Sequence, residues 1–107
     1  MSNKNTSFST NNSYSQALFE LASENNSIND VESQISSILK LISKSSDFRD
    51  LIKDPTNKIE DQLKVMDIIS EQFKFNELLK KFLSFIISKR RFFYVEKILK
   101  DFLTNCS

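Results

Sequence analysis

The stretch SKRRFFYVEKILKDF, residues 88–102, places three consecutive cations directly before three consecutive aromatic rings. The six residues are Lys89, Arg90, Arg91, Phe92, Phe93 and Tyr94. Cations that neutralise phosphates beside rings that stack on bases are the usual equipment for binding single-stranded nucleic acid. The same pattern is also typical of a junction between two helices, where cations close one helix and rings enter the core of a bundle.

Helical spacing favours the junction for most of these residues. The apolar positions of a last helix recur at intervals of three and four, and we expect one core face from Phe92, Val95, Ile98, Leu99, Phe102 and Leu103. Tyr94 then lies at the edge of this face, and Phe93 points away from it.

Charge also bears on the choice. Binding along a phosphate backbone needs an extended basic surface, whereas the formal net charge is only +1. Acidic residues such as Glu96 and Asp101 interrupt the basic segment. A small all-α regulator that binds nucleic acid through residues 89–91 therefore stays as the alternative hypothesis.

Composition excludes several classes of site. The chain has no glycine, which removes the P-loop, the dinucleotide-binding turn and the calcium loop of the EF-hand. It has no histidine, which removes histidine-dependent nucleophiles and the usual zinc ligand. We expect no catalytic residue, no cofactor and no metal, and we interpret the single cysteine, Cys106, as a reduced thiol without a functional role.

The ends of the chain and its longest apolar run predict a soluble domain. Residues 1–12 are polar and rich in Ser, Asn and Thr, and we interpret them as a flexible tail without signal-peptide character. The apolar run at residues 82–88 is far shorter than the ~20 residues that span a bilayer. We expect no direct membrane insertion.

Residues 13–105 are predicted to form a compact all-α bundle of six helices, at 13–24, 28–44, 47–53, 58–73, 77–89 and 91–105. Capping boxes are expected at Ser13 and Asn57, and further N-caps at Ser27, Ser46 and Asn76. Pro55 should end the third helix, because a proline disfavours helical conformation at the residue before it.

Three of these helices have apolar faces broader than one stripe: the first, the fourth and the fifth. We expect the fourth to be a central helix with neighbours on two sides. Several broad faces in so short a chain also predict that some apolar surface is left uncovered. A groove between two such helices is where an amphipathic helix of a partner docks.

Two segments match sequence patterns of a known family. YSQALFELA, at residues 14–22, resembles the first-helix pattern YAxALFxLA of the delta subunit of F-type ATP synthases, called the oligomycin-sensitivity-conferring protein in mitochondria. FLSFIISKRRF, at 82–92, followed by Ile98 and Phe102, resembles the pattern FLxLLxxNxRLxxLxxIxxxF of that family. Asp54-Pro55 stands where Asn-Pro often follows a short third helix. The resemblance covers residues 14–102 in the same order and spacing.

The sequence also departs from the family pattern. Lys89 replaces the usual Asn, and Arg90 the frequent Gly, so the fifth helix must end without a residue that readily adopts positive φ. Ser15 replaces an alanine. The smaller C-terminal domain of the family is absent from this sequence, which suggests a truncated chain or an isolated N-terminal domain.

The resemblance implies a six-helix domain at the top of the catalytic head of the synthase. Such a domain binds the amphipathic N-terminal helix of an alpha subunit in a groove of its first and fifth helices. Carried onto this sequence, the partner-binding residues are Tyr14, Ala17, Leu18, Leu21, Phe82, Phe85, Ile86 and Lys89. The alternative for these positions is simple membership of the core, above all for Leu18, Leu21, Phe82 and Ile86.

The resemblance further implies a non-catalytic stator component that links the head to the peripheral stalk. It implies contact with the stalk b subunits through the C-terminal domain, and a location peripheral to the energy-transducing inner membrane, on its cytoplasmic or matrix face. No nucleic acid partner is expected. The isolated domain should be a monomer.

Overall fold

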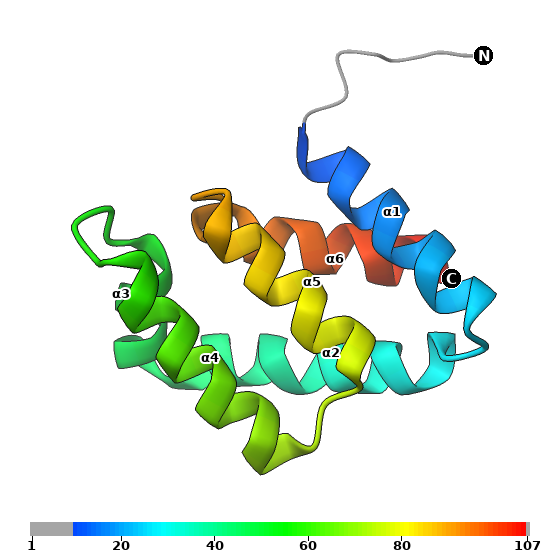
Figure 1. Cartoon of the computed structure of the whole chain (residues 1–107), viewed down its shortest axis with the longest axis horizontal. Helices are drawn as coiled ribbons and strands as arrows, with labels where there is room; N and C mark the ends of the chain where they lie inside the picture. Colours follow the sequence, from blue (N-terminus) through cyan, green and yellow to red (C-terminus); the bar gives the residue numbers. More distant parts are fainter. Residues whose placement is uncertain (1–9, 107) are drawn as a thin grey trace.

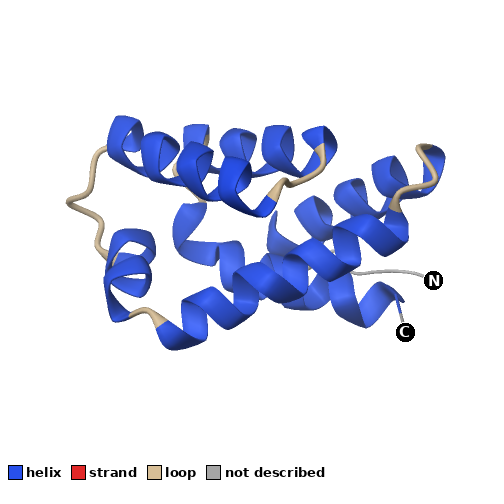
Figure 2. Cartoon of the chain, turned by 90° about the horizontal axis from the view of Figure 1, so that it is seen from below, coloured by secondary structure: helices blue, strands red, loops and turns tan. Residues whose placement is uncertain are grey.

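The computed structural model describes residues 10–106, with side chains for residues 13–105. Within that range the chain forms six α-helices, one short 3₁₀ helix and no strand, which confirms the all-α bundle (Figures 1 and 2). The helices are α1 (Thr10–Glu24), α2 (Ile28–Lys44), α3 (Ser46–Lys53), α4 (Ile59–Phe73), α5 (Glu77–Ser88), η1 (Phe92–Tyr94) and α6 (Val95–Cys106). The predicted tail at residues 1–9 and the predicted free thiol of Cys106 lie outside the described residues and side chains.

Of the predicted N-caps, Asn76 is confirmed and Ser46 is wrong by one residue. Asn76 caps α5, because its side chain accepts a hydrogen bond from the backbone N–H of Leu78 at 2.8 Å. The cap of α3 is Ser45 rather than Ser46, and its hydroxyl accepts from the N–H of Phe48 at 3.1 Å. Of the two adjacent serines, Ser45 has the extended backbone that a cap requires, with φ −110° and ψ 108°.

The two capping boxes are wrong. Helix α1 already begins at Thr10, so Ser13 lies inside it and the last three residues of the predicted tail are helical. Helix α4 begins after Lys58 without a side-chain cap. The Nδ2 of Asn57 instead donates to the carbonyls of Asp50 and Leu51, both at 3.1 Å, so this side chain stabilises the end of α3. A capping motif marks a possible start, but neighbouring backbone geometry selects the start that is used.

Ser27 precedes α2, as predicted, but its side chain does not cap that helix. Its hydroxyl donates to the carbonyl of Ala22 at 3.4 Å, in the last part of α1. The hydroxyl therefore serves the end of one helix rather than the start of the next. The predicted end of α3 is confirmed, since the helix stops at Lys53 and Asp54 is extended before Pro55.

Three helices, α1, α4 and α5, are followed within two residues by a non-glycine residue in the left-handed conformation. Asn26, Lys74 and Arg90 have φ values of 54°, 55° and 60°. At the end of α5, the N–H of Arg90 donates to Ile87 and the N–H of Arg91 to Ile86, both at 2.9 Å, which is the Schellman arrangement. In a chain without glycine, this turn forces a residue with a Cβ into a conformation that costs roughly 1–2 kcal/mol.

The core contains the face predicted for the last helix. Its members Phe92, Val95, Ile98, Leu99 and Phe102 are buried, and Leu103 is partly buried. Helix α6 packs against α1 and α2. Phe93 and Tyr94 are exposed. Residues 92–94 belong to the separate 3₁₀ helix η1, because the Schellman turn reverses the chain before α6 begins.

Helix α4 is not the central helix that was predicted. It packs chiefly against α5, and it leaves Ile68 and Phe73 51% and 42% exposed. Helix α5, in contrast to α4, has neighbours on both sides, since α1 and α4 flank it (Figure 1). The breadth of an apolar face measures how much surface a helix can bury, whereas chain topology decides how much of it is covered.

No helix within residues 10–106 is both long enough and apolar enough to cross a lipid bilayer.

Candidate protein-binding groove

Helices α1 and α5 leave an open apolar hollow of about 300 Å³ between them. It is lined by Tyr14, Ala17, Leu21, Leu78, Lys81, Phe82 and Phe85. The α1 residues recur at helical spacing along one face, and so do the α5 residues, so each helix contributes one wall. Because each wall extends over about two turns, the hollow is a groove rather than an isolated pit.

Two apolar side chains in the walls of the groove are exposed to solvent. Leu21 on α1 is 42% exposed, and Phe85 on α5 is 47% exposed. The ring of Tyr14 meets the ring of Phe85 edge to face, with centroids 5.9 Å apart and planes at 71°. This aromatic contact joins the two walls at the end where α1 begins and α5 finishes.

Two lysines are associated with the groove, Lys81 within α5 and Lys89 at its C-cap. Lys81 lines it and is exposed. The Nζ of Lys89 lies 5.5 Å from the centroid of the Phe85 ring, within the range of a cation–π contact. Lys89 therefore marks the end of the groove next to the aromatic pair.

Leu18 and Ile86 are fully buried beneath this surface. They belong to the hydrophobic core, where they hold the two helices against the rest of the bundle. Phe82 is intermediate in position, since it lines the groove but is only 7% exposed.

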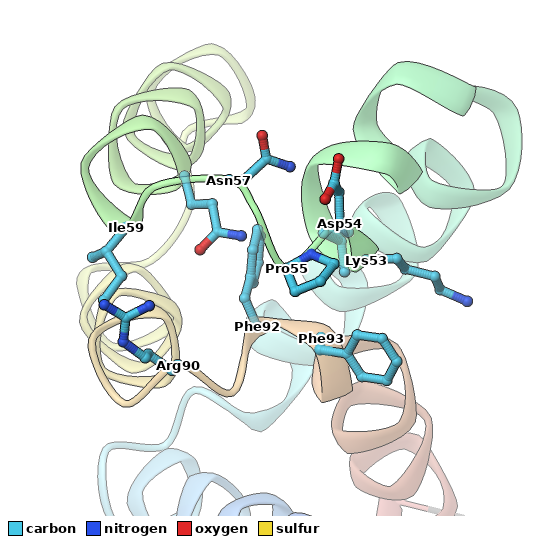
Figure 3. A pocket seen from close by; sticks show the side chains of 10 residues that line it. Lys53, Asp54, Pro55, Asn57, Ile59, Arg90, Phe92 and Phe93 are labelled. Atoms are coloured by element: carbon cyan, nitrogen blue, oxygen red, sulfur yellow. The ribbon is translucent and has the colours of Figure 1, made fainter.

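The basic turn, residues 89–91, has a different geometry. Arg90 lines a hollow of about 180 Å³ with Ile59, Pro55 and Phe92. Figure 3 shows Arg90 beside Ile59, with Phe93 on the other side of the Phe92 ring. Lys89 lies over Phe85, so adjacent cations of the sequence serve different surfaces. Lys89 and Arg90 therefore do not share one basic surface, although Arg90 and the exposed ring of Phe93 line the same hollow.

The hollow at Arg90 has one acidic side chain, and that side chain takes part in a local turn. Asp54 is the acidic residue that lines it, and the hydroxyl and N–H of Thr56 donate to that carboxylate, which lowers the pKa of Asp54 below its usual value. These bonds form a local turn after α3. Over the part of the chain that the structure describes, no group of three Cys, Asp or Glu side chains could hold a metal ion.

A third hollow, of about 490 Å³, lies between α2, α3 and α4 and includes Leu41, Phe48, Leu51, Val65 and Phe73. It is the consequence of the peripheral position of α4. The described residues therefore form an apolar hollow at α2, α3 and α4 that was not expected from the sequence, besides the α1–α5 groove that was.

A family model described as the ATP synthase delta (OSCP) subunit matches residues 10–107, which is most of the chain. The chain belongs to this family. The match includes both helices that form the α1–α5 groove.

Relatives of the same family agree. The chain is 63% identical over 94 residues to the ATP synthase subunit delta of Pelagibacter ubique (strain HTCC1062), covering 88% of this chain and 51% of the relative. It is 36% identical over 89 residues to the ATP synthase subunit delta of Rhizobium meliloti (strain 1021), covering 83% and 47%. The chain thus spans about half the length of these delta subunits.

The fold has a counterpart among solved structures. A chain in the cryo-EM structure of the Toxoplasma gondii mitochondrial ATP synthase hexamer superposes with a TM-score of 0.83, covering 89% of this chain and 53% of that chain. The sequence identity is 22%, so this likeness concerns the fold alone.

The structure brings together five of the eight residues predicted for partner binding, namely Tyr14, Ala17, Leu21, Phe82 and Phe85. Lys89 joins them at the end of the groove through Phe85, whereas Leu18 and Ile86 lie in the core. The sequence prediction omitted Leu78 and Lys81, which also line the groove. Leu78 continues the spacing of Phe82 and Phe85 by one turn, so extending the stripe would have found it.

Proposed function

We propose that this chain is the alpha-binding domain of a peripheral-stalk subunit of an ATP synthase. Its groove between α1 and α5 binds the amphipathic N-terminal helix of an alpha subunit, and so holds the catalytic head to the stalk. The observation that carries this proposal is the uncovered apolar groove, whose walls expose Leu21 and Phe85. Membership of the delta (OSCP) family supports it.

The dimensions of the groove suit a helix. From Leu78 to Phe85, the α5 wall of the groove rises about 10 Å, which equals two turns of a docked helix. Apolar side chains at intervals of three and four on such a helix would enter the groove between the rings and the leucines. A few well-buried anchors of this kind can supply useful affinity, because interface energy concentrates in a small number of residues.

The proposed role is mechanical. The domain contributes binding strength that keeps the head from turning with the rotor, and it catalyses no reaction. It is peripheral to the energy-transducing membrane, as part of the synthase. We further propose that contact with the stalk b subunits belongs to the C-terminal domain of delta subunits rather than to these six helices.

A titration tests the proposal. The chain is titrated with a peptide of about 20 residues, four to five turns beyond its flexible ends, from the N-terminus of the alpha subunit of the same organism. NMR shifts should concentrate on α1 and α5 around Ala17, Leu21 and Phe85. A scrambled peptide of the same composition is the control, because it keeps the charge and destroys the apolar stripe.

Two results would overturn the proposal. One is the absence of any saturable shift with the alpha peptide. The other is saturable, salt-sensitive binding of an oligonucleotide at Arg90 and Arg91 in place of peptide binding, which would favour a nucleic-acid-binding regulator.

A further inference from the structure

The hollow between α2, α3 and α4 is a second uncovered apolar surface. Its volume of about 490 Å³ exceeds the 300 Å³ of the α1–α5 groove. Helix α4 packs chiefly against α5, so the side of α4 towards α2 and α3 stays open. The α4 wall of the hollow extends from Val65 to Phe73, a rise of about 12 Å or two helical turns. A wall of this length accommodates two turns of a docked helix.

The exposed apolar surface continues beyond the hollow itself. Phe73 lines the hollow and is 42% exposed, whereas Ile68 lies outside the lining, one turn from Val65, and is 51% exposed. A small apolar molecule would fill the hollow and leave Ile68 in water, but a polypeptide segment covers both. The extent of the apolar surface on α4 therefore favours a protein partner.

The lining of this hollow has the opposite charge to the lining of the groove. Asp47, in the first turn of α3, is the one charged residue among the described residues that line the hollow. Lys81 has that position in the α1–α5 groove. Within residues 13–105, no ion pair or side-chain hydrogen bond holds the Asp47 carboxylate, which is exposed.

The cations nearest in sequence to Asp47 do not neutralise it. Lys44 is an exposed residue of α2 outside the lining. Arg49 is engaged elsewhere, because its Nη1 donates to the carbonyls of Ile42 and Ser43 at 2.9 and 2.8 Å. The hollow therefore presents apolar walls together with an unpaired carboxylate. A cation beside an apolar stripe complements such a surface, and an anion in the same place is repelled.

We propose that this hollow is a second docking surface, which binds an amphipathic helix that has a lysine or arginine beside its apolar stripe. The two surfaces share no lining residue, so occupation of one leaves the other open. The domain then joins two segments of different charge on two faces. This inference concerns a separate surface, and it does not depend on the proposed function.

Two synthetic helices of about 18 residues, or five turns, test the inference. Both have leucines at intervals of three and four, and the stripe is flanked by two lysines in one peptide and by two glutamates in the other. In methyl NMR spectra, the lysine peptide should give saturable shifts at Leu41, Val65 and Ile69. The glutamate peptide should bind there about three- to tenfold more weakly, since an exposed ion pair contributes a factor of about two to five and a like charge is repelled. A scrambled lysine peptide is the control for charge alone.

Asp47→Asn tests the charge of the hollow. It should reduce the preference for the lysine peptide to less than twofold, because the carboxylate supplies that preference. Asp50→Asn is the matched control, since it is the same substitution in the same helix at an exposed position outside the lining. Asp47 also suits the first turn of α3 by its charge, so melting temperatures accompany both variants. The preference is a ratio within one variant, and a loss of stability common to both peptides cancels.

Ile68→Gln and Phe73→Gln test the apolar part of the surface. Both side chains are exposed, so at least one of the two variants should keep the fold. Each should weaken binding of the lysine peptide about fivefold or more, as expected for a residue that anchors an interface. Binding of the alpha-subunit peptide, followed at Leu21 and Leu78, should stay unchanged in both.

Three results would overturn the inference: no saturable shift at Val65 and Ile69 with either peptide, equal binding of the two peptides there, or an unchanged preference in Asp47→Asn. Shifts of the same methyl groups that depend on protein concentration without peptide would assign the surface to a second copy of the chain, which also overturns it. None of these results concerns the signals of Leu21 and Leu78 in the α1–α5 groove. The proposed function therefore stands or fails separately.

Discussion

The α1–α5 groove and the basic turn each expose a phenylalanine to a similar extent. Phe85 in the groove is 47% exposed, and Phe93 beside the turn is 54% exposed. Phe85 lies among apolar residues of two helices, whereas Phe93 stacks edge-on against Tyr94 and borders a smaller hollow with charged and amide side chains. Exposure of a ring therefore says little about binding until its neighbours are known.

The cations show the same contrast. Lys89 belongs to the groove through its contact with Phe85. Arg90 has φ 60° and lines the hollow at Pro55 instead. The left-handed turn at Arg90 thus separates side chains that are consecutive in sequence. A run of charges becomes a binding surface only where the backbone keeps the charges on one face.

The largest effect is expected from removing the floor of the groove. Phe82→Ala should lower the free energy of unfolding by about 3–5 kcal/mol, because the ring is 7% exposed and its loss leaves a cavity. Chemical denaturation followed by circular dichroism measures this. A change below about 1 kcal/mol would mean that Phe82 serves the partner rather than the core.

Phe85→Glu should weaken binding of the alpha peptide at least tenfold, or about 1.4 kcal/mol, since it places a charge on the apolar wall. Phe93→Glu is the matched control and should change affinity less than twofold. Calorimetric titration gives both values, and the melting temperatures of the two variants show whether each fold survives. Equal losses in both variants would remove the distinction between the two regions.

The cations should divide in the same way. Lys89→Glu should weaken peptide binding by about 0.3–1 kcal/mol, as expected for a charge at a helix end, and the loss should shrink as salt rises. Replacing Arg90 and Arg91 together with Gln should cost less than Lys89→Glu, and mainly through the association rate. Titrations at low and high salt decide this, and a much larger loss from the double variant would assign the peptide to the turn.

The smallest effect concerns stability at the turn itself. Arg90→Gly should raise the free energy of unfolding by about 0.5 kcal/mol, because relief of the left-handed strain exceeds the entropy gained by the unfolded chain. For a domain of this size the melting temperature should rise by about 2–4 °C. Peptide affinity should stay unchanged, and a loss would show that the Arg90 side chain contributes to the groove.

Much of the site was predictable because its residues share helix faces. The stripe of Tyr14, Ala17 and Leu21 and the stripe of Phe82 and Phe85 follow from spacing, and the family resemblance indicated that the two stripes meet. The division between lining and floor was not predictable, since Leu18 and Phe85 look alike on a helical wheel. Only the packing of neighbouring helices buries Leu18 completely and leaves Phe85 half exposed.

The sequence by itself determined the elements that depend on local interactions. It determined the order and approximate spans of the six helices, the end of α3 before Pro55 and the core face of α6, because these depend on spacing and on backbone sterics within a few residues. Tertiary structure alone decided that α5 rather than α4 has neighbours on both sides, and that Lys89 and Arg90 serve different surfaces. A helical wheel gives the direction of a side chain from its own axis, whereas contacts between distant segments decide what lies in that direction.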